Sequence, residues 1–270
     1  MQLRQTSLQP VGNIRIKLLL LAITLLNLSA LNRPSGFKLE TIVIDPGHGG
    51  RDPGTSGKKT KEKDIALKIS LKLGAYIEKN FPSVKVIYTR KDDRYVSLEE
   101  RAALANKNKA QLFICIHANS LPGAPAYGTE TYVMGLHKDK GNFEVAKREN
   151  EVILMDENYQ ERYEGFDPKS PESYILFTLS QSAYHESSLK FAQKVEQQFK
   201  QKVGRFSRGV KQAGFLVLWQ TSMPSVLIET GFLSQGKEES YLASSEGQDS
   251  IASGIYRAFK DYKAEIESIN

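Results

Sequence analysis

The sequence predicts a single α/β domain over residues 38–266, built on a sheet of about six strands with helices on both faces. Apolar runs of strand length alternate along the chain with segments whose apolar residues recur at helical spacing. Several of these runs are nearly continuous, which is typical of strands covered on both faces. A length of 270 residues suits one large domain, and neither an internal repeat nor a linker interrupts the alternation.

The composition is that of an ordinary globular protein, with 40% hydrophobic and 25% charged residues. These values exclude a disordered tail protein and a polytopic membrane protein. Lysine and arginine exceed the acids by 37 to 31, a mild excess without a long basic run, so we expect no nucleic acid partner. Because Cys115 is the one cysteine, a metal would have to be held by histidines and carboxylates.

Residues 1–30 have the layout of a secretory signal peptide. Residues 1–17 contain basic side chains and no acid, residues 18–26 are almost entirely apolar, and small or polar residues follow up to Ala30. The apolar run is shorter than the roughly 20 residues that span a membrane. We expect cleavage near Ala30, export to the periplasm or cell envelope, and no stable membrane span afterwards. An uncleaved N-terminal anchor is the alternative.

The first half of the domain is expected to hold three strands and two helices. Residues 39–45 form an apolar run that ends at a Pro-Gly turn, which predicts a strand. Apolar residues recur at helical spacing in 63–80, and 84–89 follows as a second strand. Ser97 and Glu100 form the pattern in which each caps a free backbone N–H of the other, so a helix begins there. Residues 112–117 form a continuous apolar strand.

The second half is expected to hold three more strands and two further helices. Residues 129–134 alternate and suit a strand nearer an edge of the sheet. A helix is predicted over 187–202, a short strand over 215–218 and a buried strand over 225–229. A closing helix covers 251–266.

The polar segment 135–186 does not fit this alternation, because about 50 residues separate one strand from the next helix. It is rich in acids and tyrosines and contains two prolines. We expect an insertion on the sheet rather than a second core. Within it, 143–159 has the apolar stripe of an amphipathic helix.

Four polar side chains are expected to meet at the carboxyl ends of the strands, where open α/β sheets bind ligands. His48 follows the first strand, His117 ends the third and Glu229 ends the sixth. Glu62 lies just before the first helix. Zinc accepts neutral imidazole and carboxylate, uses three protein ligands in catalytic sites and keeps one position for water. A further carboxylate beside that water can take its proton.

The motifs around these residues resemble those of the zinc-dependent N-acetylmuramoyl-L-alanine amidases of bacterial cell-wall division and remodelling. The match runs in order from about residue 41 to 262. Its segments are 44–50 (IDPGHGG), 52–54 (DPG), 62–64 (EKD), 116–120 (IHANS) and 224–233 (PSVLIETGFL). The family fold is a single α/β domain with a twisted, mostly parallel sheet.

The resemblance implies a role for each of the four side chains. His48, Glu62 and His117 match the ligands of one Zn²⁺ per chain, and Glu229 matches the catalytic carboxylate. The implied reaction is hydrolysis of the amide between N-acetylmuramic acid and L-Ala of the peptidoglycan stem peptide, in cell-wall remodelling and daughter-cell separation. Peptidoglycan is thus the expected partner, together with an exported activator protein in some family members.

Two other functions compete with this one. The chain could be an exported zinc peptidase that cuts within the stem peptide, because the sequence without the resemblance does not define the scissile bond. It could also be a non-catalytic relative that binds the cell wall. Such a relative would be expected to lose a ligand or the base, whereas all four positions are occupied here.

The predicted helix at 143–159 raises a question of regulation. Some exported amidases of the resembled family keep a helix from this interval over the active site, and a partner must displace it. A carboxylate from such a helix would take the open position on zinc. Glu149 and Glu151 are the possible groups, and Glu149 is favoured because it lies in mid-segment. The alternative is a helix that packs on the sheet edge with solvated acids.

Other polar residues are expected to have structural roles. Arg90 and Arg101 are each expected to be either a surface ion-pair partner of the nearby acids or a structural tie between helix and strand, and a structural role is favoured over substrate binding. The nearby acids are Asp92, Asp93, Glu99 and Glu100. His137 and His185 are expected on the surface of the insertion. Asp45 either orients His48 or serves the Pro-Gly turn. Asn119 is expected either to contact the substrate or to cap the turn after its strand. Trp219 is expected to pack at the rim of the crevice.

Overall fold

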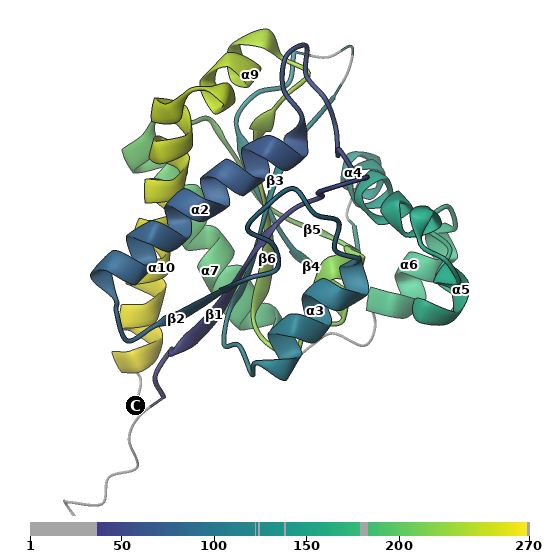
Figure 1. Ribbon diagram of the computed structural model, residues 1–270, viewed down its shortest axis with the longest axis horizontal. Coiled ribbons are helices and arrows are strands. Elements are labelled where there is room, and N and C mark those ends of the chain that lie inside the picture. The colour runs from purple at the N-terminus through teal and green to yellow at the C-terminus, as the bar shows by residue number, and fades with distance from the viewer. Residues whose placement is uncertain (1–36, 122, 124, 138, 179–182, 269–270) are drawn as a thin grey trace, which may run out of the picture. The chain divides into compact units, whose positions relative to one another are not determined.

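The structure is a computed structural model that describes residues 37–121, 123, 125–137, 139–178 and 183–268 (Figure 1). Residues 39–268 belong to one compact unit, to which the description below is confined. The predicted signal peptide lies outside the described residues. Within the described ranges, the helices are too short or too polar to cross a membrane.

The centre of the fold is a six-stranded sheet in the order β2-β1-β3-β6-β4-β5 (Figure 1). Its strands are β1 (Thr41–Pro46), β2 (Lys85–Tyr88), β3 (Phe113–Asn119), β4 (Thr129–Met134), β5 (Ser207–Ala213) and β6 (Ser225–Phe232). All neighbouring pairs are parallel except β4 and β6. The predicted α/β class and mostly parallel sheet are confirmed.

Helices cover both faces of the sheet because the strand side chains alternate between two apolar cores. One core contains Ile114 and Ile116 of β3 and is covered by α2 (Glu62–Asn80), α7 (His185–Gln198) and α10 (Ser245–Ser268). The other contains Phe113 and Cys115 and is covered by α3 (Leu98–Lys107), the one-turn α8 (Leu216–Trp219) and the segment between β4 and α7. The side chain of each strand residue therefore points to one face of the sheet or the other according to its place along the strand.

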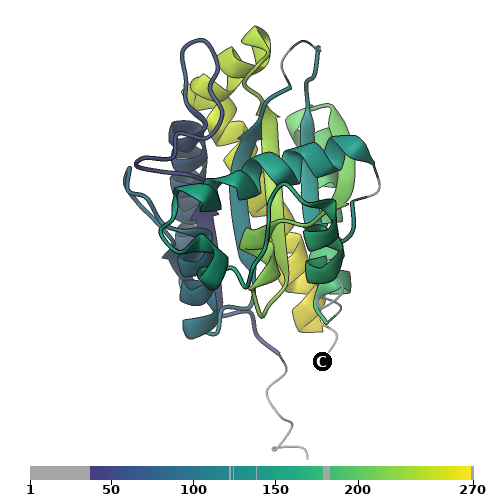
Figure 2. The same ribbon diagram turned by 90° about the vertical axis from the view of Figure 1, so that its right-hand side faces the viewer.

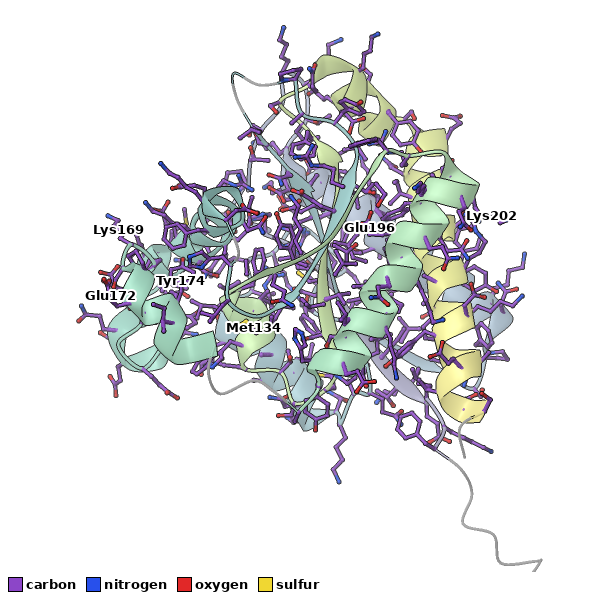
Figure 3. The ribbon with its side chains drawn as sticks, turned by 180° about the vertical axis from the view of Figure 1, so that it is seen from behind. Met134, Lys169, Glu172, Tyr174, Glu196 and Lys202 are labelled. Atoms are coloured by element: carbon purple, nitrogen blue, oxygen red, sulfur yellow. The ribbon has the colours of Figure 1, made fainter. Side chains whose placement is uncertain are left out.

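A buried carboxylate fastens α7 to the first of these faces. Glu196 accepts hydrogen bonds from the hydroxyls of Thr129, Thr131 and Ser207 (Figure 3). Burial raises the pKa of Glu196, although these three hydroxyls oppose the shift. The threonines and serine of β4 and β5 thus face α7, which leaves their neighbours in sequence to face the opposite side.

One predicted element is corrected, and two observed elements were not predicted. Residues 215–218, expected as a strand, form α8 instead, because Asn150 accepts the backbone N–H of Leu216 and the chain turns there. The edge strand β5 was not predicted, since its sequence SRGVKQA lacks an apolar alternation. Helix α9 (Gly236–Ala243) was also missed.

The segment between β4 and α7 lies across the second face of the sheet (Figure 2). It consists of α4 (Lys140–Asn150), a 3₁₀ turn η1 (Glu151–Met155), α5 (Tyr159–Arg162) and α6 (Pro171–Thr178). The predicted amphipathic helix therefore ends earlier than expected, at Asn150. Asp139 caps α4 by accepting the backbone N–H of Asn142.

Candidate metal and catalytic site

His48 stands in the loop that follows β1, held in a backbone conformation that is unusual for a residue with a side chain. Its φ is 60°. The preceding Gly47 has no Cβ, and a Cβ there would lie 2.4 Å from Nε2 of His117. Glycine at 47 is therefore required for the His48 and His117 rings to approach, and their centroids lie 4.7 Å apart.

Glu62 begins α2 and is completely buried. One carboxylate oxygen accepts hydrogen bonds from Nδ1 of His117 and the backbone N–H of Ala118, both at 2.9 Å. The other accepts the N–H of Thr55 at 2.8 Å and lies 3.1 Å from Nε2 of His48. Glu62 thus links the loop after β1 to the end of β3.

His117 and Glu229 reach the same side of the sheet through strand alternation. His117 follows Phe113 and Cys115 at two-residue steps on β3, and Glu229 follows Leu227 on β6. The two residues are direct partners in the β3–β6 register. Both side chains therefore face the segment between β4 and α7.

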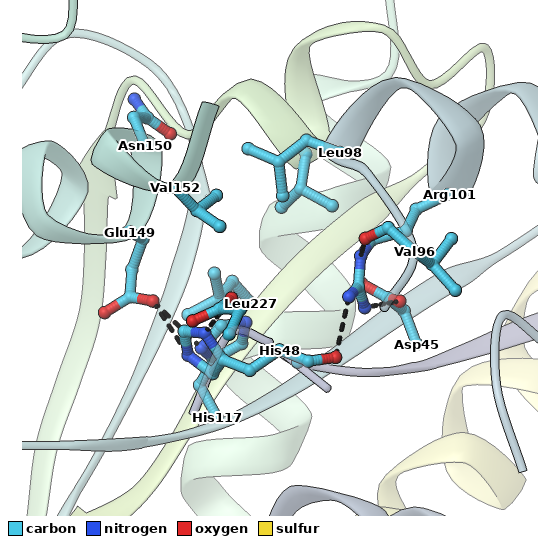
Figure 4. Close-up of a pocket in the computed structure, with 13 residues that line it drawn as sticks. Asp45, His48, Val96, Leu98, Arg101, His117, Glu149, Asn150, Val152 and Leu227 are labelled. Atoms are coloured by element: carbon cyan, nitrogen blue, oxygen red, sulfur yellow. Dashed lines mark hydrogen bonds and ion pairs between the residues drawn. The ribbon is translucent and has the colours of Figure 1, made fainter. Parts of the chain in front are cut away.

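That segment supplies a fourth group, Glu149 of α4. One of its carboxylate oxygens lies 3.2 Å from Nε2 of His48 and 3.2 Å from Nδ1 of His117 (Figure 4). Donor atoms of His48, Glu62, His117 and Glu149 all lie within 4.8 Å of one another. The structure thus brings together the three predicted ligands, and it adds Glu149 but not Glu151.

The donor set fits a zinc ion. Four ligands about 2.0–2.1 Å from a central zinc would be separated by roughly 3.3 Å in a tetrahedral arrangement. The separations of 2.9–3.2 Å between the imidazole nitrogens and the two carboxylates are close to this value. Nε2 of His48 and one oxygen of Glu149 are also buried without a hydrogen-bond partner among the described residues. Two imidazoles and a carboxylate are a donor set that zinc prefers.

The charges of the histidines and carboxylates in the site shift one another's pKa values. Burial alone lowers the pKa of His48, but the nearby carboxylates of Glu62 and Glu149 and the hydrogen bond to Asp52 raise it well above its ordinary value. Burial alone raises the pKa of Glu62, yet the charge of His48 and its hydrogen bonds hold it at about 2. The imidazoles and the carboxylates therefore stabilise each other's charged forms, and a divalent cation would compete with protons for the imidazole nitrogens.

Glu229 differs from the other acids because neither of its oxygens has a hydrogen-bond partner among the described residues, although both are buried. Burial raises its pKa well above the ordinary value, and the charges of Glu62 and Glu149 add to the shift. A buried, unpartnered carboxylate is costly for stability. Glu229 thus carries a buried carboxylate without a compensating hydrogen bond, directly beside His117 in the sheet.

Arg148 fastens Glu149 in the site. Its guanidinium donates to Glu149 at 3.0 Å, to the Asn119 side-chain oxygen at 2.9 Å and to the backbone oxygen of Ser120 at 3.1 Å. Burial alone raises the pKa of Glu149, but Arg148 and the two histidines hold it well below its usual range. Helix α4 is thus held to the end of β3 by an ion-paired arginine.

His48 is oriented by Asp52, which the sequence reading did not single out. Nδ1 of His48 lies 2.7 Å from the Asp52 carboxylate, so Nε2 faces the metal group. Asp45, the acid considered for this role, instead accepts from Thr89 and Arg101. The spacing of four residues between His48 and Asp52 was the available signal.

Arg90 and Arg101 are structural, as predicted, but they are buried rather than on the surface. Arg101 donates to Asp45 and to the backbone oxygens of Pro46 and His48. Arg90 donates to the oxygens of Pro46 and Gly47. Both arginines therefore fix the loop that carries His48.

The remaining residues lie outside the metal group. His137 packs against Phe143, and His185 lies 3.1 Å from the backbone oxygen of Met134, so both are half-buried rather than solvated. Trp219 packs on the core as expected. Asn119 accepts the N–H of Ser120 and donates its amide to Glu130.

Helix α4 divides the crevice into two cavities. One, of about 480 Å³, is lined by the loop around His48 and by η1, including Glu151 and Leu154. The other, of about 350 Å³, lies between α4 and the end of the sheet formed by β4 and β5. Glu149 lies between the two cavities and covers the metal group. Its side chain is itself only 6% exposed to solvent.

Comparisons with known proteins agree with this geometry. A sequence profile of the family described as N-acetylmuramoyl-L-alanine amidase matches residues 42–261. The amidase AmiC of Escherichia coli O6:H1 is 34% identical over 232 residues, which cover 83% of this chain and 53% of AmiC. The chain therefore spans about half the length of that relative.

Solved structures show the same architecture. An N-acetylmuramoyl-L-alanine amidase from Clostridium difficile 630 is 29% identical, with a TM-score of 0.62 over 84% of this chain and 97% of that one. The CwlD amidase of Clostridioides difficile, solved in complex with the GerS lipoprotein, is 28% identical, with a TM-score of 0.62 over 84% and 99%. The resemblance drawn from the sequence motifs is thus confirmed, and the chain belongs to the N-acetylmuramoyl-L-alanine amidase family of enzymes.

Proposed function

We propose that the chain is a zinc-dependent hydrolase that cleaves the amide between N-acetylmuramic acid and L-Ala of peptidoglycan. His48, Glu62 and His117 would hold one zinc ion. The observation that carries the proposal is the meeting of these donor atoms next to Glu229, a buried carboxylate without a hydrogen-bond partner among the described residues. Zinc at this position would polarise the scissile carbonyl and lower the pKa of a bound water.

The protein side chains would carry the proton transfers. Glu229 would take a proton from the attacking water and deliver it to the departing amine of L-Ala. A carboxylate whose pKa is raised by burial suits this exchange, because its affinity for a proton is closer to that required near neutral pH. Asp52 would hold His48 in the orientation that presents Nε2.

The form described here would be closed. Glu149 lies within 3.2 Å of both ligand nitrogens, in the place that a catalytic site leaves for water. Helix α4 would therefore exclude both water and substrate, and displacement of α4 would open the site. Glu149 rather than Glu151 would be the inhibitory group, because Glu149 belongs to the group of converging donor atoms and Glu151 does not.

Export and a partner complete the proposal. Basic, apolar and small segments within residues 1–30 support export to the periplasm or cell envelope, where peptidoglycan is found. An exported protein would displace α4, consistent with the complex of the CwlD amidase with a lipoprotein. Cell-wall remodelling and daughter-cell separation would be the process served.

The test is digestion of purified peptidoglycan by the full chain and by a Glu149→Ala variant, each with zinc and with a chelator. New amino termini are then identified. L-Ala termini that disappear with chelator support the proposal. Termini within the stem peptide would indicate a peptidase, and wall binding without any new terminus from either protein would indicate a non-catalytic relative.

A further inference from the structure

A β-bulge brings two cations of the edge strand β5 to the same side of the sheet as the metal group. In the register with β4, Ser207 pairs with Thr129 and Val210 pairs with Thr131, so β5 contains one extra residue. Gly209 lies in the bulged stretch between Ser207 and Val210, and its φ is +84°. Without the bulge, Arg208 and Lys211 would point to opposite faces, because they are three residues apart.

Both cations converge on one carboxylate. Nε of Arg208 lies 3.1 Å from Glu130, and the Lys211 ammonium donates to the same oxygen of Glu130. The other oxygen of Glu130 accepts from the Asn119 amide at 2.6 Å and the Tyr132 hydroxyl at 3.2 Å. Glu130 is 2% exposed, so this cluster is an ordered part of the fold.

The cluster retains positive charge and free donors. One carboxylate compensates one of the two cations, and the side chains of Arg208 and Lys211 remain 31% and 22% exposed. The terminal nitrogens of Arg208 donate no hydrogen bond to the described residues. An arginine with a free fork of N–H groups matches a carboxylate in a bidentate manner.

These donors line the 350 Å³ cavity beside α4. Its other walls include Phe232 and Leu121, which are apolar, and Glu144 of α4. The cavity therefore has a cationic wall on β5 and an apolar wall, and its α4 side contributes Glu144 and Arg148. Displacement of α4 would uncover both walls, since they belong to the loop after β3 and to strands β5 and β6.

The pocket lies at peptide distance from the reacting group. Glu130 is the register partner of Glu229 in the β4–β6 pair, which places their backbones about 5 Å apart. Strand β5 is one strand further, or roughly 10 Å from β6. Two residues of extended peptide reach about 7 Å. The side chains of Arg208 and Lys211 reach back from β5 to Glu130 of β4, which covers the remaining distance. A group on the residue after L-Ala would thus arrive near Arg208 and Lys211.

We propose that Arg208 and Lys211 form a subsite for a carboxylate on the stem-peptide residue that follows L-Ala. This inference rests on the proposed amidase function and identifies the chemical class that its peptide side recognises. Glu130 and the Gly209 bulge position the two cations, and the buried ring of Phe232 lies against the Arg208 guanidinium. Leu121, which is exposed, contacts the apolar part of the peptide. The subsite distinguishes a free carboxylate from its neutral amide.

The test compares two synthetic substrates, N-acetylmuramoyl-L-Ala joined to a second residue that carries either a free α-carboxylate or the primary amide. The ratio of kcat/KM for the two substrates is measured in the zinc-loaded full chain. The same ratio is measured for Arg208→Gln, Lys211→Gln and the double variant. Lys202→Gln, a change of an exposed lysine in the helical extension η2 (Phe199–Val203) after α7 (Figure 3), is the matched control.

In the full chain and in the control, we expect kcat/KM to be about tenfold higher for the carboxylate substrate than for the amide. This is the size expected for one partly solvated, charge-assisted hydrogen bond. The preference should fall to about twofold or less in the double variant. An equal preference in the full chain and the double variant would overturn the proposal.

A binding measurement separates this proposal from the proposed function. Calorimetry of the two L-Ala dipeptides, acid and amide, is carried out on the zinc-loaded Glu149→Ala chain and on the same chain with Arg208→Gln. Tighter binding of the acid that is lost with Arg208→Gln supports the subsite even where neither substrate is hydrolysed. Equal binding of acid and amide refutes the subsite even where both are hydrolysed.

Discussion

Removal of the Arg148 side chain should activate the enzyme, because this arginine holds α4 against the end of β3. Its contacts with the body of the domain are hydrogen bonds of 2.9 Å to Asn119 and 3.1 Å to the Ser120 backbone. Hydrogen bonds from charged groups contribute about 1.5–3 kcal/mol when buried. The Arg148 side chain is 35% exposed, so we discount the pair to about 1–2 kcal/mol in total.

This free energy sets the expected size of the effect. A loss of about 1–2 kcal/mol from the closed form raises the open fraction by roughly 5–30-fold, provided that the open form is rare. The rate of peptidoglycan hydrolysis by Arg148→Ala should rise by the same factor. Zinc content should stay at one ion per chain, since Arg148 is not a metal ligand.

The assay is release of L-Ala termini from purified peptidoglycan at matched zinc content. Lys147→Ala is the control, because Lys147 lies next to Arg148 on α4 and its side chain forms no hydrogen bond or ion pair with the described residues. It should leave the rate unchanged. A rate for Arg148→Ala that is equal to or below that of the original chain, with zinc bound, would refute the inhibitory role of α4.

Further predictions concern the metal, the base and the buried ion pair. His48→Ala and His117→Ala should each lose most of the zinc in metal analysis, and full retention in both would place the site elsewhere. Glu229→Gln should keep zinc and fold but lose about 10²–10⁴-fold in turnover; loss of zinc as well would make Glu229 a ligand. Arg101→Ala should lower the melting temperature by roughly 6–20 °C without loss of zinc, because breaking a buried ion pair costs about 3–5 kcal/mol. Burial raises the pKa of Asp45, but the charge of Arg101 and the hydrogen bonds from Arg101, Thr89 and Cys115 together lower it. The stabilisation by the Asp45–Arg101 pair is therefore present above about pH 4 and is lost as the pH falls further. The melting temperatures of the original chain and Arg101→Ala should therefore converge in acid, and a constant difference down to pH 2 would contradict this assignment.

The sequence by itself determined the fold class and the positions of the principal polar groups. Continuous apolar runs at β1, β3 and β6 predict buried strands, since each strand must fill a core on both sides. Polar residues at the ends of such runs then fall at one edge of the sheet. His48, Glu62, His117 and Glu229 could be grouped in this way before their geometry was known.

Local patterns failed where tertiary contacts decide the conformation. Strand β5 is polar because it lies at the edge of the sheet and its side chains bind Glu130 and Glu196 rather than filling a core. Residues 215–218 are apolar enough for a strand, yet Asn150 accepts the N–H of Leu216 and the segment closes a helical turn.

The choice between Glu149 and Glu151 was also a matter of tertiary structure. Both acids belong to the same predicted helix, and sequence spacing places neither against a metal. The helix ends at Asn150, whose amide group binds the backbone of Gly214 and Leu216 and so fixes the rotation of α4. Arg148 adds a second anchor at Asn119. These contacts join residues more than 25 positions apart, and only their packing turns Glu149 toward His48 and His117.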